Sequence, residues 1–185
     1  MLLDRSSGLI KIREMLMDSD VYLVGHNVTY DLAVAVAGDP SLLPLVFSAY
    51  DDKRIGCTMI FEMMATIAER GIGPQDRFNL AALVLKHFEK DRSEEKNNPN
   101  SWRMRYQELD GVPIGRWPEE ARRYAMDDAS DTLDVWNAQI ARYGFLPDLE
   151  NQFRYDWALR LMRVWGVRTD GPAVGRLKHD LEAHV

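Results

Sequence analysis

The sequence predicts an α/β fold in which helices flank a sheet, and three observations support this class. Residues 21–24 form a compact run of β-favouring side chains ended by Gly25, which is typical of a buried strand. Residues 28–37 follow at once with an apolar helical pattern, so the chain passes from a strand through a short loop into a helix. Several later segments again repeat apolar residues at helical spacing, as expected of helices that cover a sheet.

Length, composition and charge narrow the class of protein. The 185 residues can bury one sizeable core, or one domain and the start of another. No apolar run approaches the roughly 18 residues of a membrane span, so no membrane partner is expected. The net charge of −6 argues against a surface that coats nucleic acid, but it is compatible with an acidic metal site that grips only a strand end. The single Cys57 excludes an internal disulfide, and residues 1–7 lack the apolar core of a signal peptide, so we expect a cytoplasmic location.

The first half of the chain divides at polar and glycine-containing breaks. A helix is predicted over residues 9–17, and the helix after the strand ends at the Gly-Asp-Pro of residues 38–40. A hydrophobic segment at residues 42–47 follows. A Met-rich amphipathic helix is predicted over residues 57–70, and we interpret its methionines as core packing.

In the second half, helical patterns lie on both sides of a polar segment. Residues 89–101 are the most polar and loop-like part of the chain, which we expect to be exposed and mobile. Pro118, followed by two glutamates, suits the start of a long helix. Gly166 closes a later apolar helix, and Asp170 is the predicted cap of the last one. The helices predicted in this half span residues 79–88, 119–140, 157–165 and 171–184.

One acid of the long helix lies on an otherwise apolar stripe. Steps of three and four residues place Asp128 on this stripe, so we predict that Asp128 faces the interior, with Tyr124 one turn earlier on the same face. A carboxylate turned toward a core needs a compensating cation, metal or set of donors. An arginine is the simplest such partner, and a metal ion is the alternative. The stripe consists of Ala121, Ala125, Asp128, Thr132, Trp136 and Ile140.

A second pair of polar residues follows the predicted strand. Asn27 and Asp31 lie one helical turn apart at the carboxyl end of that strand, where open α/β sheets bind ligands. A purely structural interpretation is also open. In that case Asn27 caps the helix and Asp31 complements the positive end of the helix dipole.

Arginines and aromatic residues alternate between residues 102 and 123. Arg103 and Arg105, between Trp102 and Tyr106, form a candidate surface for stacking bases and holding phosphates. The alternative is a long surface connection that its aromatic residues anchor.

The two acidic segments resemble known motifs. Residues 24–31, Val-Gly-His-Asn-Val-Thr-Tyr-Asp, resemble the second exonuclease motif of the DEDD superfamily, and residues 124–133 resemble the third motif in its tyrosine form. Their separation is similar to that in the 3′→5′ proofreading domain of family A, DNA polymerase I-like, DNA polymerases. The resemblance implies an RNase H-like exonuclease fold with Asp31 and Asp128 as catalytic, metal-ligating acids. It implies further that Tyr124 orients the attacking water and that Asn27 and Tyr30 bind the substrate strand.

The cofactor and the partner follow from that resemblance. Phosphodiester hydrolysis by two divalent ions, roughly 3.5–4 Å apart, needs several carboxylates that converge on one spot. Oxygen ligands suit Mg²⁺ or Mn²⁺. The expected partner is the 3′ end of single-stranded DNA, in the cytoplasm of a bacterium or of a phage-infected host.

The resemblance also divides the chain. Residues 1–145 correspond to the exonuclease-like domain, and residues 146–185 to the start of a phage-like family A polymerase region. The first motif of the family, Asp-x-Glu on an early strand, is not found before Asn27, because the residue two places after Asp4 is Ser6. We therefore expect a fold that lacks its first strands and a chain truncated at both ends. Such a chain would hydrolyse DNA weakly or not at all alone, with the missing upstream and polymerase segments as possible partner chains.

Two other functions are compatible with these residues. An RNase D-like 3′→5′ exoribonuclease shares the DEDD site but is not expected to carry the polymerase-like tail. A non-catalytic domain would keep the fold for nucleic-acid binding or for polymerase architecture.

Overall fold

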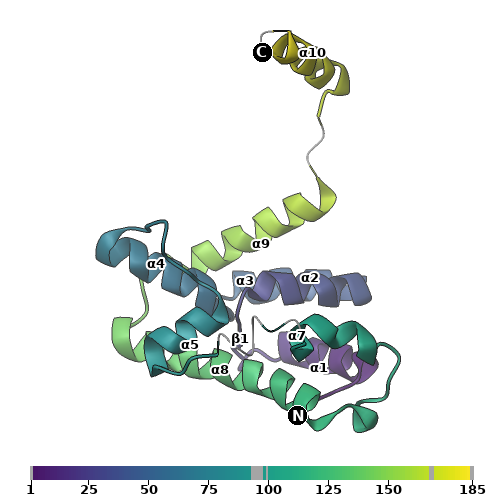
Figure 1. Ribbon diagram of the computed structural model, residues 1–185, viewed down its shortest axis with the longest axis vertical. Coiled ribbons are helices and arrows are strands. Elements are labelled where there is room, and N and C mark those ends of the chain that lie inside the picture. The colour runs from purple at the N-terminus through teal and green to yellow at the C-terminus, as the bar shows by residue number, and fades with distance from the viewer. Residues whose placement is uncertain (1, 93–97, 99, 167–168, 184–185) are drawn as a thin grey trace.

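The computed structural model describes residues 2–92, 98, 100–166 and 169–183 (Figure 1). The described residues are rich in helix, with 71% of them helical, and they form one sheet of two parallel strands. The protein is therefore a helix-rich member of the α/β class. The described elements are α1 (Arg5–Met17), β1 (Leu23–Gly25), α2 (Val28–Gly38), η1 (Pro40–Leu42), α3 (Leu43–Asp51), β2 (Ile55–Cys57), α4 (Thr58–Arg70), α5 (Leu80–Phe88), α7 (Trp102–Arg105), η2 (Tyr106–Leu109), η3 (Ile114–Arg116), α8 (Glu119–Tyr143), α9 (Leu149–Trp165) and α10 (Gly171–Glu182).

The two strands pair in parallel through a β1–α2–α3–β2 crossover. Leu23 lies opposite Ile55, and Gly25 lies opposite Cys57. The long helix α8 packs against β1, and α9 packs against β2. In Figure 1, α8 runs along the lower edge of the molecule and α9 rises above the strands. The carboxyl end of β1 therefore lies between α8 and the start of α2.

The larger of two hydrophobic clusters among the described residues joins the helices around the sheet. Buried side chains of α2, α3, α4, α8 and α9 meet in it, among them Leu32, Val46, Phe61 and Trp136. From α9, Trp157 is 1% exposed and stacks on Tyr50 of α3 with ring centroids 5.9 Å apart. The predicted domain boundary after residue 145 stays a prediction, and α9 shares this core with the residues before it.

The structure confirms most of the predicted helices and adds one strand. The helices over residues 9–17, 28–37, 57–70 and 79–88 are present as α1, α2, α4 and α5, although α1 starts earlier, at Arg5. Asp4 caps α1 by accepting a hydrogen bond of 2.9 Å from the backbone N–H of Ser7. The hydrophobic segment at residues 42–47 belongs to the short helices η1 and α3. Strand β2 was not predicted, because its three buried residues lie directly before a strong helical pattern.

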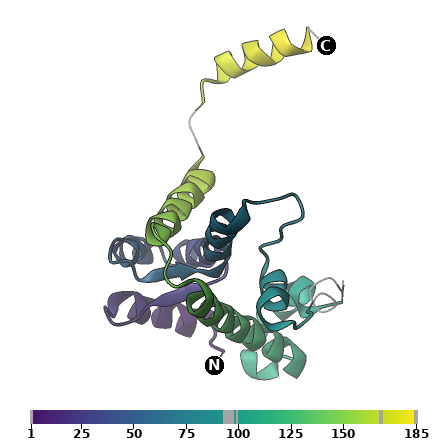
Figure 2. The ribbon, with the colours of Figure 1, turned by 90° about the vertical axis from the view of Figure 1, so that its left-hand side faces the viewer.

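The C-terminal helix α10 differs from the other long helices in its burial. None of its residues is buried, and Figures 1 and 2 show it apart from the rest of the described molecule. The predicted cap is confirmed, since the side chain of Asp170 accepts a hydrogen bond of 3.1 Å from the N–H of Ala173. In the described part of the chain, no helix combines the length and the apolar character needed to cross a membrane.

Candidate nucleic-acid and metal site

A cleft with a volume of about 910 Å³ lies at the carboxyl end of β1. Its walls come from the β1–α2 junction, the start of α5, the α7–η2 segment and the first half of α8. Five of the seven predicted site residues line it, although they come from three separate segments. These five are Asn27, Asp31, Arg103, Tyr124 and Asp128.

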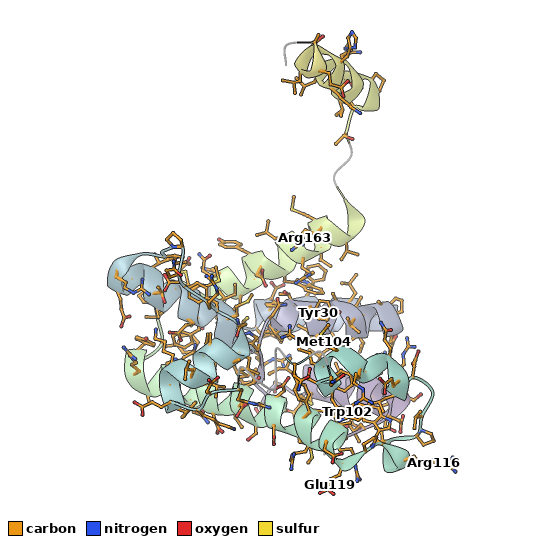
Figure 3. The ribbon with its side chains drawn as sticks, in the orientation of Figure 1. Tyr30, Trp102, Met104, Arg116, Glu119 and Arg163 are labelled. Atoms are coloured by element: carbon orange, nitrogen blue, oxygen red, sulfur yellow. The ribbon has the colours of Figure 1, made fainter. Side chains whose placement is uncertain are left out.

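The other two predicted site residues, Tyr30 and Arg105, lie outside the lining of the cleft. Tyr30 is 56% exposed on α2, and its ring packs against the guanidinium of Arg160. Arg105 forms an ion pair of 2.7 Å with Glu108 and covers the ring of Trp102, 4.4 Å from its centroid. Figure 3 marks Tyr30 on α2 and Trp102 on α7. Arg105 is therefore held by contacts within its own segment.

Asn27 takes up an unusual backbone conformation at the end of β1. Its φ of 58° and ψ of 43° lie in the left-handed region, which asparagine tolerates better than most residues. It occupies the cap position of α2, but its side chain makes no capping hydrogen bond. Its Oδ1 instead accepts a hydrogen bond of 3.3 Å from Nη2 of Arg160 in α9. The interpretation of Asn27 as a side-chain cap is therefore wrong, whereas Asp31 does lie in the first turn of α2, as the same structural interpretation expects.

Asp31 supplies one of the two carboxylates that line the cleft. Within the described part of the chain, Asp31 makes no hydrogen bond and no ion pair. Its side chain reaches solvent through the open cleft, yet the cleft walls remove part of its hydration. Burial accordingly raises the pKa of Asp31 above its ordinary value. Such a carboxylate suits a cationic ligand, because a cation in the cleft would offset the lost hydration.

Asp128 lines the cleft but does not face the core as predicted. Its side chain is 33% exposed, and its Oδ1 lies 3.4 Å from Nη1 of Arg92. The buried acid of α8 is Asp131, which is 9% exposed and forms ion pairs with Arg92 and, at 3.3 Å, with Lys90. The prediction was wrong because α8 borders the core on one side and the cleft on the other, and Asp128 lies on the cleft side. An arginine is thus one partner of Asp128 in the structure.

Arg92 is the main residue of the site that the sequence did not indicate. It belongs to the segment predicted to be exposed, yet only 4% of it is accessible. The prediction of exposure is wrong for Arg92, while residues 93–97 and 99 lie outside the described residues. The segment around Arg92 is polar and has no periodic pattern, so the sequence gives no indication that Arg92 is buried.

Tyr124 is buried in the cleft wall, with 5% of its surface exposed. Its ring meets the ring of Tyr106 edge to face, with centroids 6.1 Å apart, and the guanidinium of Arg92 lies 5.9 Å from its centroid. Burial, and then the nearby Tyr124 and Asp128, raise the pKa of Tyr106 to about 12. Tyr106 and His26 also line the cleft, and neither was predicted as a site residue. Nδ1 of His26 lies 2.9 Å from Oγ1 of Thr58.

The described side chains of the cleft include two carboxylates, fewer than a complete two-metal centre needs. No group of three or more His, Cys, Asp or Glu side chains in the described residues could hold a metal ion. Mg²⁺, however, keeps several waters and commonly takes only one or two carboxylates together with substrate phosphates. Asp31 and Asp128 are two carboxylates that line one cleft, which is the number of protein ligands such an ion takes, and Asp128 also lies 3.4 Å from Nη1 of Arg92.

The chain matches no protein-family model, no curated protein and no solved structure. The functional interpretation therefore depends on the residues of the cleft and on the motifs that contain them.

Proposed function

We propose that the cleft is a 3′→5′ exonuclease site of the DEDD type, in its tyrosine form, on an RNase H-like fold. The observation that carries the proposal is the meeting of two distant motifs in one cleft. Asn27 and Asp31 come from the end of β1 and the start of α2, whereas Tyr124 and Asp128 come from α8. A purely structural pair of helix-face acids would not need to share a cleft with the polar residues of the other motif.

Each side chain has a role that suits hydrolysis of a strand end. Asp31 and Asp128 would hold a divalent cation, Mg²⁺ or Mn²⁺, which would supply Lewis-acid chemistry at a phosphate. Arg103 lines the same cleft and carries the planar donor fork that suits phosphate oxygens. Tyr124 lines the cleft with its hydroxyl buried in the wall, and a movement of this side chain toward the cleft would let the hydroxyl orient the water that attacks the last phosphodiester bond.

The substrate is the 3′ end of a single strand of DNA. A cleft of about 910 Å³ falls in the size range of sites that take small ligands, so it suits the terminal nucleotides of a strand. Residues 146–185, with α9 and α10, then correspond to the start of a family A polymerase region, and the chain to part of a DNA polymerase I-like enzyme.

A non-catalytic strand-binding domain is the second candidate. Arg92 supports it, because a guanidinium 3.4 Å from Asp128 already supplies the positive charge that a metal would bring. The small number of acids supports it as well, since two closely spaced divalent ions need more negative charge than two carboxylates provide.

Hydrolysis of 3′-labelled single-stranded DNA with Mg²⁺ or Mn²⁺ separates the two candidates. We expect slow, metal-dependent release of nucleotides that Asp128→Ala abolishes and Tyr124→Phe lowers. Asp134→Ala, an exposed acid on the same helix, is the matched control and should leave the rate unchanged. Binding without release favours the second candidate. Release that persists undiminished in Asp128→Ala, or the absence of both binding and release, contradicts the exonuclease proposal.

A further inference from the structure

Helix α9 contacts the start of α2 through several side chains. Nη2 of Arg160 lies 3.3 Å from Oδ1 of Asn27, and its guanidinium lies 5.7 Å from the ring centroid of Tyr30. One turn earlier on α9, Asp156 accepts a hydrogen bond of 2.8 Å from the hydroxyl of Thr29. These contacts fix α9 against the segment that carries Asn27.

The chemistry of Arg160 determines which way the amide of Asn27 is turned. A guanidinium carries only donors, so the amide atom that faces Arg160 has to be the oxygen. The NH₂ group of Asn27 is then directed away from Arg160. Because Asn27 lines the cleft, this group is the donor that Asn27 can offer to a ligand there.

The backbone at Asn27 is consistent with a functional side chain at this position. Its φ of 58° lies in the region where glycine has the smallest steric cost. The side chain of Asn27 does not cap α2, so local capping does not account for it. Asparagine adopts this conformation more readily than most residues, so its amide is left for contacts outside α2.

We infer that Arg160 is a positioning residue: it holds the amide of Asn27 so that the NH₂ group donates to an oxygen of the bound nucleotide strand. This inference rests on the proposed function, because the strand is the ligand. It extends the site to α9, which no motif of the sequence connects with the cleft.

The test uses the affinity of the whole chain for a short, labelled oligothymidylate with Mg²⁺. Asn27→Asp keeps an acceptor for Arg160 but removes the donor, so we expect no loss of thermal stability and an affinity lower by about tenfold. Arg160→Gln should lower the affinity by a similar factor. Arg163→Gln removes the same charge from an exposed position on the same helix (Figure 3) and should leave the affinity nearly unchanged.

A double-mutant cycle separates positioning from a direct phosphate contact. Asn27→Gly removes the amide and tolerates the left-handed backbone, so Arg160→Gln should have no further effect on affinity in that background. An equal loss in both backgrounds would overturn the inference, because Arg160 would then act independently of Asn27. An Asn27→Asp protein that binds as tightly as the unaltered chain would overturn it too.

A second measurement uses the free protein, without a DNA strand. The side-chain NH₂ signals of Asn27 in a ¹H–¹⁵N spectrum of the free protein should move strongly in Arg160→Gln and little in Arg163→Gln. Unchanged signals in Arg160→Gln would overturn the positioning role. An unaltered protein that shows these shifts but binds no oligothymidylate would instead overturn the proposed function and, with it, the strand as the ligand of Asn27.

Discussion

Nη1 of Arg92 lies 3.4 Å from Oδ1 of Asp128, at the wall of the cleft that also holds Asp31. The same guanidinium forms an ion pair with Asp131, one turn further along α8. Arg92 thus connects an acid of the cleft with an acid of the interior. The stability of α8 and the chemistry of the cleft are linked through this side chain.

Replacement of Arg92 should destabilise the fold strongly. Arg92→Gln leaves Asp131 buried without its closest cation, and removal of one partner of a buried ion pair costs about 3–5 kcal/mol. The control is Lys90→Gln, because Lys90 contacts the same acid at 3.3 Å but is 56% exposed. We expect about 1 kcal/mol or less for the control. Urea unfolding gives both values, and equal stabilities of the two variants would disprove the role of Arg92.

A cluster of polar side chains around the buried Glu62, from α4, α5 and α8, should make stability depend on acid pH. Burial alone would raise the pKa of Glu62, but hydrogen bonds from His87, Lys86 and Gln139 outweigh it and lower this pKa to about 2. Since the folded pKa lies below the ordinary value of 4.5, the stabilisation is complete above about pH 4.5 and is lost as the pH falls toward 2. Glu62→Gln should therefore be less stable at neutral pH, and its difference from the unaltered chain should shrink across this window. A constant difference from pH 7 to pH 2 would contradict the assignment.

The charged carboxylate of Asp31 should lower the free energy of unfolding at neutral pH. Burial raises its pKa above 3.8, so the folded state disfavours the charged form. The penalty is absent at a pH well below 3.8 and complete above the folded pKa. We therefore expect Asp31→Asn to be at least as stable as the unaltered chain at pH 7, with the difference vanishing in acid. A clear loss of thermal stability at pH 7 would show that the carboxylate has a stabilising partner.

Gly56 in β2 packs so closely against Trp136 in α8 that an added methyl group should not fit. A Cβ at Gly56 would lie 2.7 Å from Cη2 of Trp136 and 2.8 Å from Cε1 of Tyr22. Overpacking of this kind costs about 1–3 kcal/mol, so Gly56→Ala should lower the unfolding free energy by that amount. Gly115→Ala, where a Cβ meets no atom within 4 Å, is the control. Denaturant unfolding of both variants decides the point, and a Gly56→Ala protein of unaltered stability would contradict the packing.

The helices were predictable from the sequence because each carries its own periodic pattern and breakers. The Met-rich segment and residues 79–88 show apolar spacing that tertiary contacts only reinforce, and they form α4 and α5. Strand β2 has three residues, and its pairing with β1 depends on a crossover of two helices. No local pattern of so short a segment can indicate that pairing.

The site was partly predictable because its two motifs are local sequence patterns. Asn27, Asp31, Tyr124 and Asp128 are recognisable within two short motifs, and all four line the cleft. Which acid of α8 is buried depends on Arg92, which lies 36 residues before Asp128 in the chain. Helical spacing places Asp131 three residues after Asp128, but it cannot show where a distant arginine docks or which of the two acids it buries.

The central claim is that Asp31 and Asp128 together bind a divalent cation and the 3′ end of a DNA strand. The measurement that tests it most directly is the affinity for a 5′-labelled single-stranded oligonucleotide with and without Mn²⁺, in the unaltered chain and in Asp31→Asn. We predict that Mn²⁺ tightens binding and that Asp31→Asn removes the Mn²⁺ effect while the protein stays folded. Binding that is indifferent to Mn²⁺, or a Mn²⁺ effect that survives intact in Asp31→Asn, would contradict the claim.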